Sequence, residues 1–185
     1  MDDHLRSTRV LSGDKKSPDT AIDRANWYAI RTRSRCEWKV SELLRRAGVE
    51  EFLPAWTESV RWSDRAKKTL RPLFPGYVFA RFSRFAGCSG ILALPAVVQI
   101  LGTDELASIC DDEIANLRRV AALPVSPCPY VAAGEIVTIT SGPLIGVSGV
   151  VVRNKGALRL IVSVEMLGQA CAVEIDAVDV ETSTK

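Results

Sequence analysis

The sequence has a single histidine and no pair of cysteines at the spacing of a metal site. His4 lies in a polar N-terminal stretch, and five cysteines are scattered singly along 185 residues. We therefore predict neither a zinc site nor a disulfide framework, and we expect the cysteines to serve as small apolar residues. A nucleophilic hydrolase needs a base held rigidly beside its nucleophile, which a histidine in a polar tail cannot provide. We predict a protein that is not an enzyme and uses no metal or other cofactor.

Long apolar runs are also missing. No stretch of about 18 apolar residues is available to cross a membrane, and the first twenty or so residues lack the short apolar core of a signal peptide. We therefore predict a cytoplasmic protein without membrane contact. The hydrophobic content of 47% over 185 residues allows a real core and suits one medium domain or two small ones.

The charged residues are unevenly distributed, although the formal net charge is only +2. Residues 27–84 contain 13 Lys and Arg against 6 Asp and Glu, whereas residues 125–185 contain 4 against 6. A basic N-terminal half indicates an anionic partner, most commonly nucleic acid. A basic face that is merely solvated would have the same composition.

The N-terminal half alternates between strand and helix patterns. Residues 1–25 are polar and aperiodic, and we expect a disordered or loosely attached tail. "WYAIRT" then predicts a strand, and Ser34 with Glu37 has the spacing of a capping box before a helix over residues 37–47. "EEFLPAW" predicts a short strand, and residues 57–69 are polar enough for either a hairpin or a mobile loop.

Three further elements complete this half: a strand over residues 77–82, a weak helix over 84–94, and the strand "VVQILG". A last helix, "DDEIANLRRVAAL", is predicted to be capped by Asp111 or Asp112. The order β-α-β-β-α-β followed by a terminal helix is the split pattern of ferredoxin-like domains, in which helices cover one face of an antiparallel sheet.

The composition changes after three prolines at positions 124, 127 and 129. Prolines this dense predict a semi-rigid linker at a domain boundary. Beyond it, short strands rich in Val and Ile are separated by glycine-containing turns, which predicts a small all-β barrel.

The strand within "RPLFPGYVFARF" is apolar on both faces. Tyr77 and Phe79 point to one side, while Val78, Ala80 and Phe82 point to the other. Because helices cover only one face of the predicted sheet, we expect an exposed aromatic patch on the second face, which would be a contact site. The alternative is that the terminal helix, the loop or the other domain covers it.

The chain resembles the NusG transcription elongation factors over residues 27 to about 181. The resemblance rests on "WYAIRTRSRCEWKV", "RPLFPGYVFARF", "VVQILG" and the segment that opens with "AAGEIVTITSGP". It implies an α+β protein in which a ferredoxin-like α/β sandwich (NGN) is joined by a Pro-rich linker to a small SH3-like β-barrel (KOW). The expected boundaries are a tail over 1–25, NGN over 26–121, a linker over 122–131 and KOW over 132–182.

The resemblance implies that the NGN domain binds the clamp helices of the largest RNA polymerase subunit. Bridging the polymerase cleft would suppress pausing or termination, while the KOW domain recruits a partner. The polymerase-binding residues carried over are Tyr28, Phe74, Pro75 and Tyr77, and the phase of the strand adds Phe79.

A basic set could contact upstream DNA or the exposed non-template strand, with a tryptophan as a stacking surface. The alternative is a solvated loop. The set consists of Arg31, Arg33, Arg35, Arg61, Trp62, Arg65, Lys67 and Lys68.

The KOW segment departs from the pattern of housekeeping members. Leu144 replaces the phenylalanine expected after Gly142-Pro143, and residues 166–169 read MLGQ instead of IFGR. In the family this corner helps to bind termination factor Rho or a small-subunit ribosomal protein, so both partnerships are in question. The apolar residues here are either a remodelled partner surface or barrel core: Leu144, Val162, Met166 and Leu167.

These departures favour a specialised, operon-specific antiterminator of the RfaH or polysaccharide-operon type over a housekeeping factor. A different possibility is a ribosome-associated or RNA-binding KOW protein that uses the basic half on RNA. It predicts salt-sensitive RNA binding without affinity for polymerase.

Overall fold

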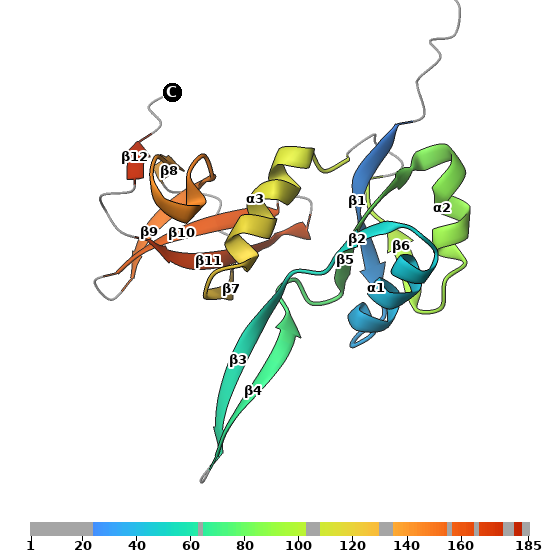
Figure 1. Cartoon of the computed structure of the whole chain (residues 1–185), viewed down its shortest axis with the longest axis horizontal. Helices are drawn as coiled ribbons and strands as arrows, with labels where there is room; N and C mark the ends of the chain where they lie inside the picture. Colours follow the sequence, from blue (N-terminus) through green and yellow to red (C-terminus); the bar gives the residue numbers. More distant parts are fainter. Residues whose placement is uncertain are drawn as a thin grey trace, which may run out of the picture.

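The computed structural model describes residues 24–62, 65–102, 108–129, 135–154, 157–164, 167–175 and 180–182. The predicted tail therefore lies almost entirely outside the described residues. The described residues form two β-sheets, a projecting hairpin and three α-helices (Figure 1). In chain order the elements are β1 (Ala25–Thr32), α1 (Glu37–Arg46), β2 (Glu50–Phe52), β3 (Ala55–Trp62), β4 (Arg65–Pro72), β5 (Tyr77–Ser83), α2 (Arg84–Leu92), β6 (Val97–Ile100), α3 (Asp111–Ala121), β7 (Val125–Pro129), β8 (Glu135–Ile139), the short 3₁₀ helix η1 (Gly142–Leu144), β9 (Ser148–Asn154), β10 (Ala157–Val164), β11 (Gln169–Ile175) and β12 (Val180–Thr182).

The N-terminal sheet has the strand order β2-β5-β1-β6, and its neighbouring strands are antiparallel. This confirms the ferredoxin-like prediction. Helices α1 and α2 lie on one face, where Val40 and Leu44 of α1 pack with Val78, Ala80 and Phe82 of β5. The alternation along β5 therefore puts Val78, Ala80 and Phe82 under these helices and leaves Phe79 on the opposite face.

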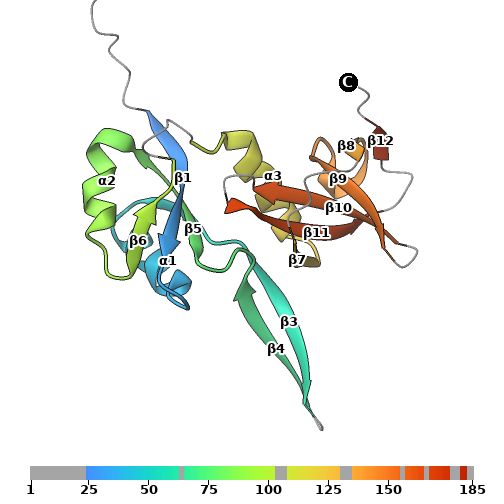
Figure 2. The same ribbon diagram turned by 180° about the vertical axis from the view of Figure 1, so that it is seen from behind.

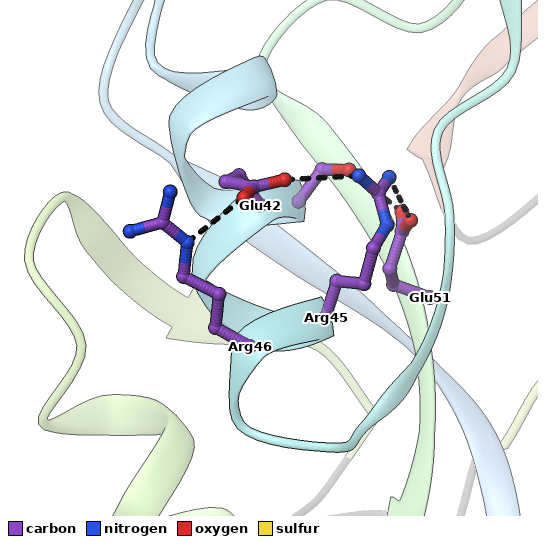
Figure 3. A network of polar contacts seen from close by, with 5 residues as sticks. Glu42, Arg45, Arg46 and Glu51 are labelled. Carbon is purple, nitrogen blue, oxygen red and sulfur yellow. Dashed lines mark hydrogen bonds and ion pairs between the residues drawn. The ribbon is translucent and has the colours of Figure 1, made fainter.

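Helix α1 forms because its apolar residues recur at helical spacing and Gly48, with φ +73°, follows its end. The predicted capping box is wrong: Cys36 is the N-cap, no side chain caps the helix, and the Glu37 carboxylate turns elsewhere. On its outer side, the exposed Arg45 pairs with both Glu42 and Glu51, which ties α1 to β2 (Figure 3).

Helix α3 covers the second face of the N-terminal sheet. Its acidic first turn suits the helix dipole, although Cys110 and not an aspartate is the N-cap. Ile114, Leu117 and Val120 are buried at i, i+3 and i+6, in one cluster with Phe79 of the sheet. In Figures 1 and 2 this helix lies between the sheet and the C-terminal barrel.

Strands β3 and β4 form a two-stranded hairpin that projects away from both domains (Figure 2). They pair from Ala55 opposite Pro72 to Trp62 opposite Arg65, and an ion pair joins Glu58 to Arg71 across the strands. The hairpin prediction for residues 57–69 is confirmed over the paired residues, and the loop alternative is wrong there.

The C-terminal sheet has the order β12-β8-β9-β10-β11-β7. Its first strand in the chain, β7, occupies residues for which a linker was predicted, and it pairs with β11 from Gln169 opposite Pro129 to Val173 opposite Val125. Prolines are compatible with this position because β7 is an edge strand, whose outer side needs no N–H donors. The linker prediction is therefore wrong for residues 125–129.

Candidate functional site

The segment Phe74–Tyr77 is a tight turn at the entrance to β5. Gly76 has φ +86°, Pro75 precedes it, and the Tyr77 N–H donates to the Phe74 carbonyl at 3.2 Å. Proline at the second position and a left-handed glycine at the third define a type II turn. The sequence F-P-G-Y thus favours a type II turn at this point.

Both polar groups of Gly76 are bound by other elements. Its carbonyl accepts the Thr32 N–H at the end of β1 at 2.8 Å, and its N–H donates to the Glu37 carboxylate of α1 at 2.7 Å. The turn is therefore fixed to the sheet and to the first helix.

The aromatic residues beside the turn are mostly buried. Phe74 and Phe79 are 1% and 0% exposed and meet edge to face, with ring centroids 5.8 Å apart. Tyr77 is half-buried and Pro75 is exposed. The expectation of an open aromatic patch is therefore wrong in this arrangement, because helix α3 covers the face on which Phe79 lies.

Tyr28 lies on the other face of the sheet from Phe79. It packs against Phe82 beneath α1 and α2, with ring centroids 4.8 Å apart. Its neighbour Trp27, which the sequence analysis did not select, shares the cluster of Phe79. The alternation of side chains along a strand could have identified Trp27, because residues 27 and 29 point to one face of the sheet and residues 28 and 30 to the other.

Arg118 of α3 joins the helix to this side of the sheet. Its guanidinium lies 5.0 Å from the ring centroid of Trp27 and 5.3 Å from that of Phe52, and it pairs with Glu50 at 3.0 Å. Arg81 of β5 lies 3.8 Å from the same Glu50. Cation–π contacts and ion pairing thus add to the apolar packing that holds α3 against the sheet.

The contact of α3 with the barrel combines apolar packing with a polar link, because the buried residues of α3 belong to the same apolar cluster as Leu144 and Val162 of the barrel. Arg119 donates to the Ile145 carbonyl just after η1, and also to Asn116 within the helix. Beside this contact, a cavity of about 1000 Å³ opens between the base of the hairpin, the end of α3 and the barrel, with Trp56, Leu70 and Pro143 in its wall. The two domains therefore meet at α3 through a shared apolar cluster, with this cavity beside it.

The basic residues fall into two groups on different elements. Arg31, Arg33 and Arg35 lie at the end of β1 and just after it, whereas Arg61, Trp62, Arg65, Lys67 and Lys68 belong to the paired strands of the hairpin. Arg31, Arg33, Arg35 and Lys68 are exposed and form no ion pair with another described residue. Several arginines elsewhere are paired, among them Arg45 and Arg81, whereas these four cations remain available to an anionic partner.

The apolar residues chosen in the barrel are mostly core. Leu144 and Val162 are 4% and 5% exposed in the cluster that includes α3, and Leu167 packs against it. A partner surface on Leu144 and Val162 is therefore wrong in this arrangement, and Met166 lies outside the described residues. Ile145, beside Leu144, is 56% exposed and remains accessible.

Within the described ranges, no three His, Cys, Asp or Glu side chains gather in a way that could hold a metal ion. None of the described helices combines the length and apolarity needed to span a membrane.

A ferredoxin-like domain followed by a small β-barrel, with an F-P-G-Y turn at the sheet entrance, defines the NGN–KOW class of transcription factors. The family model described as "Transcription termination factor nusG" matches residues 25–118. The NusG proteins of Yersinia pestis and Escherichia coli K12, both named transcription termination/antitermination proteins, are each 31% identical over 172 residues, covering 84% of this chain and 94% of the relative. The chain belongs to the NusG family.

A solved structure has the same fold. The structure titled "Domain interaction in Thermotoga maritima NusG" matches with a TM-score of 0.53 at 22% identity, covering 87% of this chain and 98% of that one. At this identity the likeness supports the two-domain fold alone.

Proposed function

We propose that this protein is a transcription elongation and antitermination factor whose N-terminal domain binds the clamp helices of RNA polymerase. The observation that carries the proposal is the turn at Phe74–Tyr77, which is fixed on both sides and leaves Pro75 exposed. Family membership supports the general role in transcription.

We assign the direct contact with the polymerase to the exposed edge of the turn. Tyr77 is half-buried and pairs with Arg31 across strands β5 and β1, so these two side chains and the ring of Pro75 can meet one partner surface. Phe74 and Phe79 support the turn from within, and they would join the contact only after α3 moved away. Tyr28 contributes to the core beneath α1 and α2.

The proposed mechanism is binding without bond-making. A factor that binds the closed clamp more tightly than the open clamp shifts the polymerase toward the closed, elongating state, by no more than its difference in affinity for the two. The unpaired cations at the end of β1 and on the hairpin would add contacts to phosphates of upstream or non-template DNA.

The barrel is proposed to recruit a further partner, such as Rho or a small-subunit ribosomal protein. The cavity beside the α3–barrel contact supports a barrel that can separate from the N-terminal domain, and separation would expose part of the shared apolar cluster. Ile145, on the loop that contacts Arg119, would become fully accessible on separation.

The test is binding to core RNA polymerase by Tyr77→Ala and Pro75→Ala variants, with Phe85→Ala as the matched control. Phe85 lies on α2 and is 74% exposed, so its removal takes away an aromatic side chain far from the turn. We expect weaker polymerase binding for both turn variants, with unchanged far-UV spectra, and wild-type binding for the control.

Unchanged retention of both turn variants would remove the proposed docking surface. Salt-sensitive RNA binding by a protein without polymerase affinity would instead favour the ribosome-associated or RNA-binding alternative.

An operon-specific role, as in antiterminators of the RfaH type, is the finer form of this proposal. It is supported by Leu144 in place of phenylalanine and by Gln169 in place of arginine. In vitro transcription through a terminator, with and without Rho, tests it: a specialised factor should increase read-through without stimulating Rho. Stimulation of Rho-dependent termination would indicate a housekeeping factor.

A further inference from the structure

Glu37 is a buried carboxylate without an ion-pair partner among the described residues. It is the first residue of α1 and is only 5% exposed. Removing a charged carboxylate from water is costly unless polar groups bind it. The helix N-terminus offsets part of this cost, and the carboxylate accepts a hydrogen bond from the Gly76 N–H at 2.7 Å.

That hydrogen bond depends on how the Pro75–Gly76 peptide is oriented. Type I and type II turns differ mainly by a flip of this central peptide, which reverses the direction of the Gly76 N–H. With Gly76 at φ +86° the turn is type II and the N–H points to Glu37. After a flip to type I, the N–H would point away and the carboxylate would be buried without this donor.

The cost of that flip is high because the bond is charge-assisted. A hydrogen bond to an ionised carboxylate is stronger than one between neutral groups, and an unsatisfied buried charge would be left behind. Glu37 thus favours one peptide orientation over the other, although it belongs to a different element from the turn.

We propose that Glu37 is a positioning residue that holds the Phe74–Tyr77 turn in its type II form and thereby orients Pro75 and Tyr77 for contact with the polymerase. The inference rests on the proposed function for the partner, but the lock on the turn is a property of the protein alone. Glu37 itself is buried beside the turn and makes no contact with the partner.

The first measurement concerns the turn. In the full-length protein, amide hydrogen exchange of Gly76 should become about tenfold or more faster in Glu37→Ala, since a hydrogen bond of ordinary net strength is lost. Glu37→Gln keeps an acceptor oxygen and should restore most of the protection. Glu42→Ala, which removes an exposed carboxylate from the same helix, should leave Gly76 unchanged.

The second measurement is affinity for core RNA polymerase, normalised to the folded fraction from thermal unfolding. We expect a loss of about tenfold or more for Glu37→Ala, which corresponds to the free energy of such a bond, with partial rescue by Glu37→Gln. Gly76→Ala is an independent variant, because an added Cβ meets no atom within 4 Å and acts only by disfavouring positive φ. It should weaken binding in the same direction.

Unchanged Gly76 exchange in a folded Glu37→Ala protein would overturn the inference. Wild-type polymerase affinity in a Glu37→Ala protein whose Gly76 has lost protection would also overturn it. The turn would then have lost its hydrogen bond to Glu37 without any effect on polymerase binding. If the wild-type protein itself fails to bind polymerase, the proposed function fails, and so does the role of Glu37 in orienting Pro75 and Tyr77 for that contact. Amide exchange of Gly76 still decides whether Glu37 holds the turn.

Discussion

Replacing Arg118 with alanine should loosen helix α3 from the sheet. The guanidinium lies near the rings of Trp27 and Phe52, at 5.0 and 5.3 Å from their centroids, and pairs with Glu50 at 3.0 Å. All of these partners belong to the N-terminal sheet, whereas Arg118 belongs to α3. The substitution therefore tests the attachment of the helix without altering the buried apolar residues.

The expected magnitude follows from the exposure of the groups. The Arg118 side chain is 46% exposed and Glu50 48%, so the ion pair contributes at most about 1 kcal/mol. Each cation–π contact at a partly exposed site adds roughly 0.5 kcal/mol. We expect Arg118→Ala to lower the free energy of unfolding by about 1–2 kcal/mol, or several degrees in Tm.

Arg84→Ala is the matched control. Among the described rings, Arg84 lies over that of the exposed Phe85, at 6.0 Å, so its loss should cost at most about 0.5 kcal/mol. Urea unfolding of the three proteins at low and high salt provides the comparison, and salt should reduce only the ion-pair part of the Arg118 effect. Equal stabilities of the two variants would refute the attachment role of Arg118.

Two further predictions concern the barrel. Gly149→Ala would place a Cβ 2.5 Å from the backbone oxygen of Ile161 on the paired strand, which cannot move independently, so urea unfolding should show a loss of about 1–3 kcal/mol. Burial raises the pKa of the Cys171 thiol from 9.0 to about 12, so between these values the unfolded chain loses this proton first and the folded state should lose stability as pH rises. A Cys171→Ala variant should lack this component, and at pH 8 a thiol reagent should modify the exposed Cys110 well before Cys171.

The ferredoxin-like topology could be predicted because its signals are local. Alternation along residues 77–82 and helical spacing in α1 each depend on a few neighbouring residues, and the order of the elements restricts the possible sheets to a few. The type II turn was also implicit in the sequence, since Pro75-Gly76 permits few other backbone shapes.

The position of α3 could not be predicted in the same way. The helical spacing of Ile114, Leu117 and Val120 shows that these residues share one face of the helix. It does not show which surface of the protein that face packs against. The strand β7 was missed because prolines remove donors, which resembles a linker until an edge position is known. The role of Glu37 was missed because its partner is a backbone N–H 39 residues away.

The burial of the aromatic face changes what mutations there can show. Phe74 and Phe79 are almost fully buried, so truncating either to alanine should cost about 3–5 kcal/mol of stability. A loss of polymerase binding in such variants would report unfolding as readily as a lost contact. Pro75 and Tyr77 retain exposed surface beside the same turn, so variants at these two positions can separate binding from folding.

Helix α3 also links the two domains energetically. Its buried residues pack on the sheet beside Phe79, while Arg119 on the same helix binds the loop after η1 of the barrel. Any movement that uncovers Phe79 must therefore either break the Arg119 contact or carry the barrel along with the helix. The buried residues of α3 share one apolar cluster with Phe79 of the sheet and with Leu144 of the barrel, so separating the helix from either side exposes apolar surface and should cost free energy in both cases.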